Sequence, residues 1–145
     1  MNQKIALIEQ EIAKAVAGKA EVTEKVLTAI LAGGHILLED IPGVGKTTLA
    51  LAFSRTMGLN FQRVQFTPDV VPSDITGFTM YEKESGIFRY RPGAVMCNFF
   101  LADEINRTSS KTQSALLEAM QEGKVTVDGE PHPLPDPFIV MATQN

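Results

Sequence analysis

The chain has few of the residues on which metal centres and thiol chemistry depend. Among its 145 residues there is one cysteine, Cys97, and there are two histidines, His35 and His132. A single cysteine excludes an intramolecular disulfide and a cysteine-rich metal site, and the two histidines lack ligand-like spacing, so no zinc site is predicted. Because Cys97 stands between Met96 and Phe99-Phe100, we interpret it as a small buried apolar side chain and not as a nucleophile.

Long apolar runs and a basic excess are also missing. No stretch approaches the roughly 20 apolar residues of a membrane span. The N-terminus, MNQKIALIEQEIAKAVAG, lacks the continuous apolar core of a secretion signal, so a cytoplasmic location is predicted. The net charge is −4, whereas nucleic-acid binders usually carry a basic surface, so nucleic-acid binding is disfavoured. The length predicts one domain, and a hydrophobic content of 44% is typical of globular proteins.

What is present is an alternation of helical and strand-like segments. Apolar residues at steps of three and four, together with glycine stops, predict helices that end at Gly18 and cover residues 20–32, 47–57 and 109–122. Short apolar runs predict strands over residues 35–40, 61–66, 99–104 and 138–143. Buried strands that alternate with helices indicate a parallel α/β sheet.

Two further segments predict β-hairpins inserted into this α/β core. Residues 77–92 alternate apolar and polar side chains around Glu84-Ser85-Gly86. Residues 124–132 place two valines before Asp128-Gly129, which is a strong signal for a two-residue turn. Two interpretations stay open: the hairpins cap the edges of the sheet, or they present a surface to a partner protein.

The segment after the first strand predicts a phosphate-binding loop. Residues 41–48 read IPGVGKTT, in which Gly43 and Gly45 let the main chain approach phosphate oxygens closely. Lys46 would lie along the β- and γ-phosphates, and the Thr47 hydroxyl would ligate Mg²⁺. The helix that begins here adds the positive end of its dipole. The predicted nucleotide-binding residues are Pro42, Gly43, Val44, Gly45, Lys46, Thr47 and Thr48.

This loop departs from the full pattern G-x-x-x-x-G-K-[ST] at one position. Asp40 stands where the pattern has its first glycine. That position starts the turn and is not the main phosphate contact, so we expect phosphate binding to survive. The dinucleotide pattern G-x-G-x-x-G fails, because Thr48 occupies the place of its third glycine.

A second motif predicts the metal ligand and the catalytic base. The apolar run after Asn98 ends in Asp103 and Glu104, two adjacent carboxylates that can fan toward one site at the end of a strand. Asp103 would hold Mg²⁺, usually through water, and Glu104 would act as general base toward the attacking water. Alone, the pair would read as an acidic loop, but a phosphate-binding loop upstream favours the catalytic interpretation.

With these motifs the chain resembles the MoxR family of AAA+ ATPases over nearly its whole length. The resemblance is carried by GGHILLEDIPGVGKTTLA, RVQFTPDVVPSDITG, LADEINRTSSKTQSALLEAMQEGKVTV and LPDPFIVMATQN. It implies that aspartate is tolerated at position 40 and that the strand order is 5-1-4-3-2. In that order the strand of the phosphate loop lies beside the last strand of this chain. The resemblance also implies that Asn145 orients the lytic water as sensor 1.

The family further implies what the chain does and with what. We expect ATP binding and Mg²⁺-dependent hydrolysis, coupled to chaperone-like remodelling or assembly of protein complexes. Hexameric rings and partners with von Willebrand factor A domains are also implied. The alternative is a nucleotide-binding fragment that acts as a binding module without turnover. A nucleic-acid motor is disfavoured, since no stripe of aromatic and basic residues is visible.

In the family a fifth strand, an arginine finger and a helical lid follow the sensor strand. Residues 1–145 are therefore expected to form an incomplete AAA+ core, with N-terminal helices over 1–34 and the segment from the phosphate loop to sensor 1 over 35–145. We expect such a chain to be weakly active on its own, because an arginine finger contributes roughly 10³–10⁵ in rate in other phosphoryl-transfer enzymes.

The resemblance also suggests where the adenine would lie, and it leaves two residue roles undecided. Val16 and Ala17 would lie near the adenine. Either Gln65 or Thr67 could hold Glu104 inactive, and the residues do not decide between them. Arg107 would form a plain salt bridge at a helix start, or it would reach a neighbouring subunit.

Overall fold

The computed structural model describes residues 2–16, 18, 20–39 and 45–144. Its helical elements are α1 (Asn2–Ala15), α2 (Ala20–Leu31), α3 (Lys46–Thr56), α4 (Pro72–Thr76), the 3₁₀ turn η1 (Ile105–Arg107) and α5 (Ser110–Glu122). Its strands are β1 (Ile36–Glu39), β2 (Phe61–Gln65), β3 (Gly77–Glu82), β4 (Ile87–Pro92), β5 (Phe99–Asp103), β6 (Lys124–Val127), β7 (Glu130–Pro133) and β8 (Ile139–Gln144). The predicted α/β class is confirmed.

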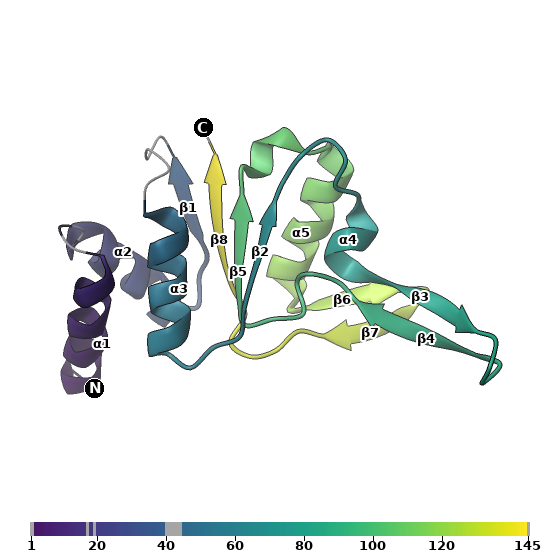
Figure 1. Ribbon diagram of the computed structural model, residues 1–145, viewed down its shortest axis with the longest axis horizontal. Coiled ribbons are helices and arrows are strands. Elements are labelled where there is room, and N and C mark those ends of the chain that lie inside the picture. The colour runs from purple at the N-terminus through teal and green to yellow at the C-terminus, as the bar shows by residue number, and fades with distance from the viewer. Residues whose placement is uncertain (1, 17, 19, 40–44, 145) are drawn as a thin grey trace.

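A four-stranded parallel sheet in the order β1-β8-β5-β2 forms the centre of the molecule (Figure 1). Leu38 pairs with Thr143 across β1 and β8, and Gln65 pairs with Asp103 across β2 and β5. The predicted neighbours are confirmed: β1, before the phosphate loop, lies beside β8, and β5 follows next. Because all the strands are parallel, their carboxyl ends meet at one edge of the sheet.

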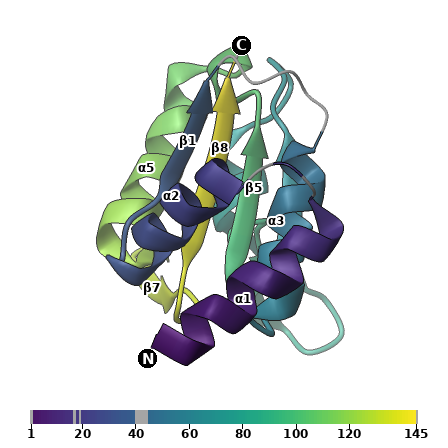
Figure 2. The ribbon, with the colours of Figure 1, turned by 90° about the vertical axis from the view of Figure 1, so that its left-hand side faces the viewer.

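Helices cover both faces of the sheet, so the protein has three layers. In Figure 2, α3 lies on one side of the strands and α5 lies on the other, and α1 crosses in front toward α3. Successive residues of β5 supply the two cores, with Phe99 and Leu101 in the first and Phe100 and Ala102 in the second. All of these side chains are fully buried. A strand buried on both faces must be apolar throughout, which explains the run Phe99–Ala102.

Two short helical turns, α4 and η1, are not among the predicted elements. α4 has five residues, which is too short to show an apolar period. It begins at Pro72, where a missing backbone N–H costs nothing, and the backbone N–H of Val71 donates to the Asp74 carboxylate at 2.9 Å. η1 has three residues and follows Glu104 directly. A local side-chain contact therefore fixes the start of α4.

The two predicted hairpins are present as separate two-stranded sheets, β3-β4 and β6-β7. Asp128 and Gly129 form the second turn with φ values of 50° and 80°, as the Asp-Gly signal predicts. In the described part of the chain neither hairpin is hydrogen-bonded to the four-stranded sheet, which argues against the interpretation as edge caps. The hairpins contact each other instead, since the rings of Tyr90 and His132 stack with centroids 3.7 Å apart.

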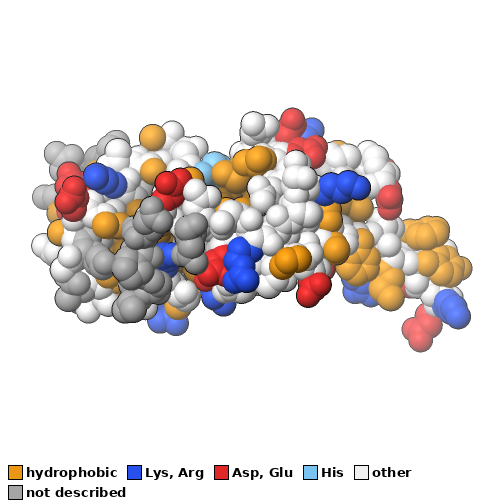
Figure 3. Space-filling view, turned by 90° about the horizontal axis from the view of Figure 1, so that it is seen from above, with side chains coloured by type: hydrophobic (Ala, Val, Ile, Leu, Met, Phe, Trp, Pro, Cys, Tyr) orange, Lys and Arg blue, Asp and Glu red, His pale blue; other side chains and the backbone are white. Residues whose placement is uncertain are grey.

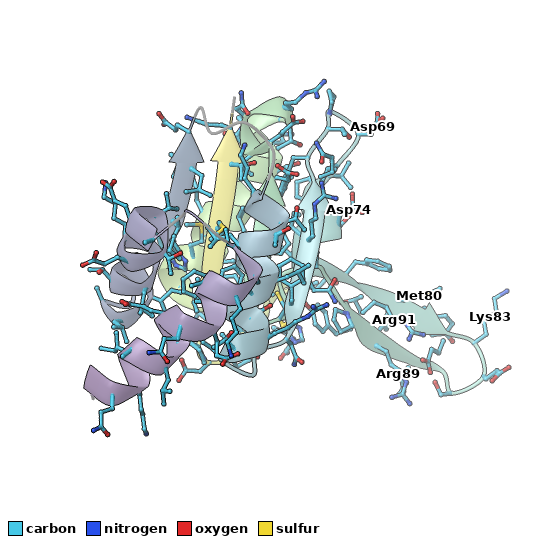
Figure 4. All side chains as sticks on the ribbon, turned by 60° about the vertical axis from the view of Figure 1, so that its left-hand side comes forward. Asp69, Asp74, Met80, Lys83, Arg89 and Arg91 are labelled. Carbon is cyan, nitrogen blue, oxygen red and sulfur yellow. The ribbon has the colours of Figure 1, made fainter. Side chains whose placement is uncertain are left out.

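The β3-β4 hairpin projects from the body of the molecule. Figure 4 shows Met80, Lys83, Arg89 and Arg91 along it, well away from the parallel sheet. Large apolar side chains on the hairpin that face solvent are Phe78, Met80, Tyr81, Ile87 and Phe88. This exposed apolar surface is consistent with the interpretation that the hairpin presents a surface to a partner.

β1 lies at the edge of the sheet and pairs with β8 alone among the described strands. Its Leu37 side chain is 53% exposed. Apolar hollows lie on either side of Leu37, one lined by Val26 and Ala29 of α2 and the other by Leu116 and Leu117 of α5. An apolar strand edge with unpaired N–H and C=O groups is a template for pairing with another chain.

We therefore predict that residues 1–145 self-associate through β1. Leu37→Lys should shift the sedimentation-velocity distribution toward monomer, because a charged side chain at an edge opposes strand addition. Leu7→Lys is the matched control, since Leu7 lies on α1 and is 60% exposed. Equal self-association in Leu37→Lys, Leu7→Lys and the unchanged chain would show that β1 is not the contact.

Candidate functional site

The candidate site lies at the carboxyl edge of the parallel sheet. Polar residues end every strand there: Glu39 on β1, Gln144 on β8, Asp103 on β5 and Gln65 on β2. The Gln144 Nε2 atom donates to Glu39 Oε1 at 2.7 Å across the first pair. Figure 3 looks onto this edge and shows acidic and basic side chains next to each other near its middle. In open α/β sheets, ligands bind at this end of the strands.

The amino end of α3 points at the same edge. Gly45 precedes the helix with φ 103° and ψ −10°, a conformation that a residue with a Cβ adopts only under strain. Lys46 opens the helix and is 8% exposed. Thr47 is half-buried and Thr48 is exposed. The first N–H groups of a helix have no partner within it, so this end favours an anion.

Several residues predicted for the site fall outside the described residues. These are Asp40, Pro42, Gly43 and Val44 of the phosphate loop, Asn145 after β8, and Ala17 near the predicted adenine position. Val16 is described and lines a small hollow between α1 and α2, with Ala13, Gly18 and Thr23.

The Asp103 carboxylate is held from two strands and lies close to Lys46. Thr143 Oγ1 donates to its Oδ1 at 2.5 Å, and Arg63 Nη2 donates to its Oδ2 at 2.8 Å. Burial alone would raise the pKa of Asp103. The hydrogen bonds from Thr143 and Arg63, with the positive charges of Arg63 and Lys46, outweigh burial and hold the pKa below its ordinary value. Asp103 is therefore ionised at neutral pH and acts as an acceptor.

Glu104 turns out of the strand in a left-handed conformation, with φ 55° and ψ 51°. A non-glycine residue there is uncommon and is found mainly where the surrounding structure enforces it. Here the backbone N–H of Glu104 donates to Thr143 Oγ1 at 2.9 Å. The turn brings Asp103 and Glu104 to the same edge, although neighbouring residues in a straight strand point to opposite faces.

The Glu104 side chain is restrained by its neighbours. Gln65 Nε2 donates to Glu104 Oε2 at 2.7 Å, and Arg107 Nη1 lies 3.0 Å from the same oxygen. Of the two candidates, Gln65 is thus the one with a hydrogen bond to Glu104 among the described residues, and the Thr67 hydroxyl accepts the backbone N–H of Asp69. Arg107 forms a salt bridge with Glu104 within its own turn, in agreement with the interpretation of Arg107 as a local salt-bridge partner.

The oxygen donors fit a magnesium ion better than a transition metal. In the described residues no group of three or more His, Cys, Asp or Glu side chains could hold a metal by itself. Mg²⁺ does not need such a cage, since it keeps several waters and binds through one or two protein oxygens and phosphates. The Thr47 hydroxyl and the Asp103 carboxylate are donors of this kind.

Cys97 and His35 lie in structural environments outside this site. Cys97 is 1% exposed, and burial raises the pKa of its thiol to about 12, so it is an inert apolar side chain as predicted. The His35 ring accepts the backbone N–H of Val140 on Nδ1 at 2.9 Å and packs edge-on against Phe138. His35 thus ties the segment before β1 to β8.

Arg63 and Thr143 are the site residues that the sequence reasoning missed. Thr143 lies in an apolar strand and reads as a core residue. Arg63 reads as an exposed charge on β2, although it precedes Gln65 by two positions and so shares its face of the strand.

Comparisons with known proteins agree with this geometry. The family model described as "ATPase family associated with various cellular activities (AAA)" matches residues 35–145. Chaperone MoxR1 of Mycobacterium tuberculosis is 48% identical over 93% of the chain, and Protein MoxR of Methylorubrum extorquens is 38% identical over 90% of it. The chain belongs to the MoxR family of AAA+ ATPases.

Two further relatives extend the comparison. The uncharacterized protein YeaC of Bacillus subtilis is 57% identical over 94% of the chain. A solved structure of a candidate ATPase from Cytophaga hutchinsonii superposes on 99% of the chain with a TM-score of 0.87 at 47% identity. The chain spans 42%, 36% and 39% of the lengths of YeaC, MoxR1 and the Methylorubrum MoxR protein, and 43% of the solved chain. No helix in the described part of this AAA+ chain has the length and apolar character that crossing a membrane requires.

The buried Thr143 hydroxyl is predicted to stabilise the edge of the sheet. Thr143→Val keeps the shape but removes the donor to Asp103 and the acceptor for the Glu104 N–H. Leaving a buried N–H unpaired costs roughly 1–3 kcal/mol, so the free energy of unfolding in urea should fall by about that amount. The control is Thr126→Val on the exposed face of β6. A loss no larger in Thr143→Val than in Thr126→Val would contradict the assignment.

Proposed function

We propose that this chain binds ATP with Mg²⁺ and that the protein which contains it hydrolyses ATP to remodel or assemble protein complexes. The observation that carries the proposal is the convergence of Asp103, Glu104 and Lys46 at one edge of the sheet, beside the amino end of α3. Membership of an ATPase family and the similarity to Chaperone MoxR1 support it.

In the proposed complex Lys46 and the N–H groups of α3 bind the β- and γ-phosphates, and Thr47 and Asp103 bind the metal. Bound Mg²⁺ would neutralise phosphate charge and orient the γ-phosphate. Lys46 is well placed for this role, because its charge already contributes to lowering the Asp103 pKa. The positive charges then lie where negative charge develops during phosphoryl transfer.

Glu104 is the proposed general base toward water. A base must be free to accept a proton, yet Oε2 of Glu104 accepts from Gln65 and pairs with Arg107. The observed arrangement is therefore a restrained one, and we propose that Gln65 must release Glu104 before turnover. Asn145 stays the proposed group that orients the water.

We also propose three properties of the whole protein. These are a hexameric ring, partners with von Willebrand factor A domains and a cytoplasmic location. The second candidate function is a binding module that holds ATP or ADP without turnover, which the restrained Glu104 favours. Steady-state phosphate release by the full gene product separates the two functions.

Nucleotide binding is predicted to depend on Lys46. Its ammonium forms charge-assisted hydrogen bonds worth roughly 1.5–3 kcal/mol each, so Lys46→Ala should weaken ATP binding by about ten- to a hundredfold. Titration of a fluorescent ATP analogue measures this. Lys25→Ala is the control, because Lys25 is exposed on α2 and forms a surface ion pair with Glu21 of the same helix. Unchanged affinity in Lys46→Ala would exclude the phosphate-loop assignment.

Turnover is predicted to depend on Glu104. In the full gene product that carries these residues, Glu104→Gln should abolish phosphate release and keep Mg·ATP bound, because the amide preserves shape but cannot accept the proton. Glu118→Gln on the exposed face of α5 is the matched control. Near-normal phosphate release in Glu104→Gln would assign the base to another residue.

A further inference from the structure

The Arg63 guanidinium connects the two carboxylates of the candidate site. Its Nη2 atom donates to Asp103 Oδ2 at 2.8 Å and to Gln65 Oε1 at 2.8 Å. Gln65 then donates its Nε2 atom to Glu104 Oε2 at 2.7 Å. A continuous line of hydrogen bonds therefore runs from the proposed metal ligand to the proposed base through two side chains of β2.

The geometry of this line determines which end of the Gln65 amide faces Glu104. Arg63 has donors only, so it must contact the carbonyl oxygen of Gln65. The amide nitrogen is then directed at the Glu104 carboxylate. Arg63 and Gln65 are two residues apart on one strand and leave it on the same face, so a movement of Arg63 changes the restraint on Gln65.

The two partners of Asp103 differ in how easily they can leave it. Thr143 holds Oδ1 and is fully buried, so it belongs to the fixed frame of the sheet. The side chain of Arg63 is 40% exposed and can turn into solvent without opening the core. A guanidinium and a divalent cation compete for the same carboxylate lone pairs and repel each other at short range.

We infer that Arg63 is a positioning residue that competes with Mg²⁺ for Asp103. When Mg²⁺ displaces Arg63 from Asp103, the restraint that Gln65 places on Glu104 weakens. The inference rests on the proposed function, since it takes Asp103 as a metal ligand and Glu104 as the base. While Arg63 is bound to Asp103, Gln65 is fixed on Glu104. Once Arg63 leaves Asp103, the Gln65 amide loses the bond that orients it, and the restraint on Glu104 weakens.

The test compares nucleotide affinity with and without metal. The ratio of the Kd of a non-hydrolysable ATP analogue in EDTA to its Kd in excess Mg²⁺ measures how much the metal contributes. Arg63→Gln removes the competing charge and should raise this ratio by about tenfold, with Arg63→Met as a second neutral variant. Arg63→Lys keeps the charge and should stay within about threefold of the unchanged chain. Arg89→Gln is the control, since Arg89 pairs with Glu82 on the projecting hairpin.

A second readout follows Gln65 directly. In the unchanged chain, the NMR resonance of the Gln65 side-chain amide should shift when Mg²⁺ and the analogue are added together. In Arg63→Gln the resonance of the Gln65 side-chain amide, measured without metal, should already lie close to the position that it reaches in the unchanged chain with Mg²⁺ and the analogue. Supporting results are the raised ratio together with this early shift.

The outcomes separate the inference from the function on which it rests. If Arg63→Gln and Arg63→Met give the same Kd ratio as the unchanged chain, the inference is wrong. The proposed function still stands in that case, provided that the unchanged chain binds the analogue more tightly with Mg²⁺ than in EDTA. If the unchanged chain binds no analogue with Mg²⁺, both are wrong. If Arg89→Gln raises the ratio as much as Arg63→Gln, the effect is one of general charge and the inference is wrong.

Discussion

The burial of β5 on both faces is the constraint on which the candidate site depends. Phe99, Phe100, Leu101 and Ala102 are fully buried, so this strand has no room for a charge until it reaches the edge of the sheet. Burying an unpaired carboxylate in such a core would cost a free energy comparable to or larger than the net stability of a small domain, or would force the carboxylate to be protonated. Asp103 and Glu104 therefore come at the first positions where polar partners are within reach, from β2 on one side and from β8 on the other.

The partners at this edge determine its electrostatics. Thr143 bridges the Asp103 carboxylate and the Glu104 backbone, and it fixes the left-handed turn that places both acids together. Arg63, Lys46 and Arg107 lie around these acids. The arrangement keeps Asp103 ionised and restrains Glu104 through Gln65. With Glu104 as the proposed base, this restraint would let the chain bind nucleotide before Glu104 can act on water.

The sequence predicted the strands, their order and the acidic pair for identifiable reasons. Strands such as Phe99–Asp103 are apolar up to their last residue, and glycines or prolines bound many of the segments, so the elements could be found locally. The order β1-β8-β5-β2 came from the family resemblance, since no local pattern encodes which strands become neighbours. Arg63 and Thr143 could not be found because their roles depend on contacts 40 residues apart in sequence. Gln65 was a candidate beside Thr67, and only the fold could separate them.

The central claim is that Mg·ATP binds at the carboxyl edge of the parallel sheet, and NMR chemical-shift mapping tests it most directly. Adding a non-hydrolysable ATP analogue with Mg²⁺ should perturb the backbone amides of Gly45–Thr48, Asp103, Glu104 and Thr143 most strongly. Amides of the projecting β3-β4 hairpin should stay unchanged. The largest shifts at Thr79, Tyr90 and His132, which line the hollow between the two hairpins, would contradict the claim.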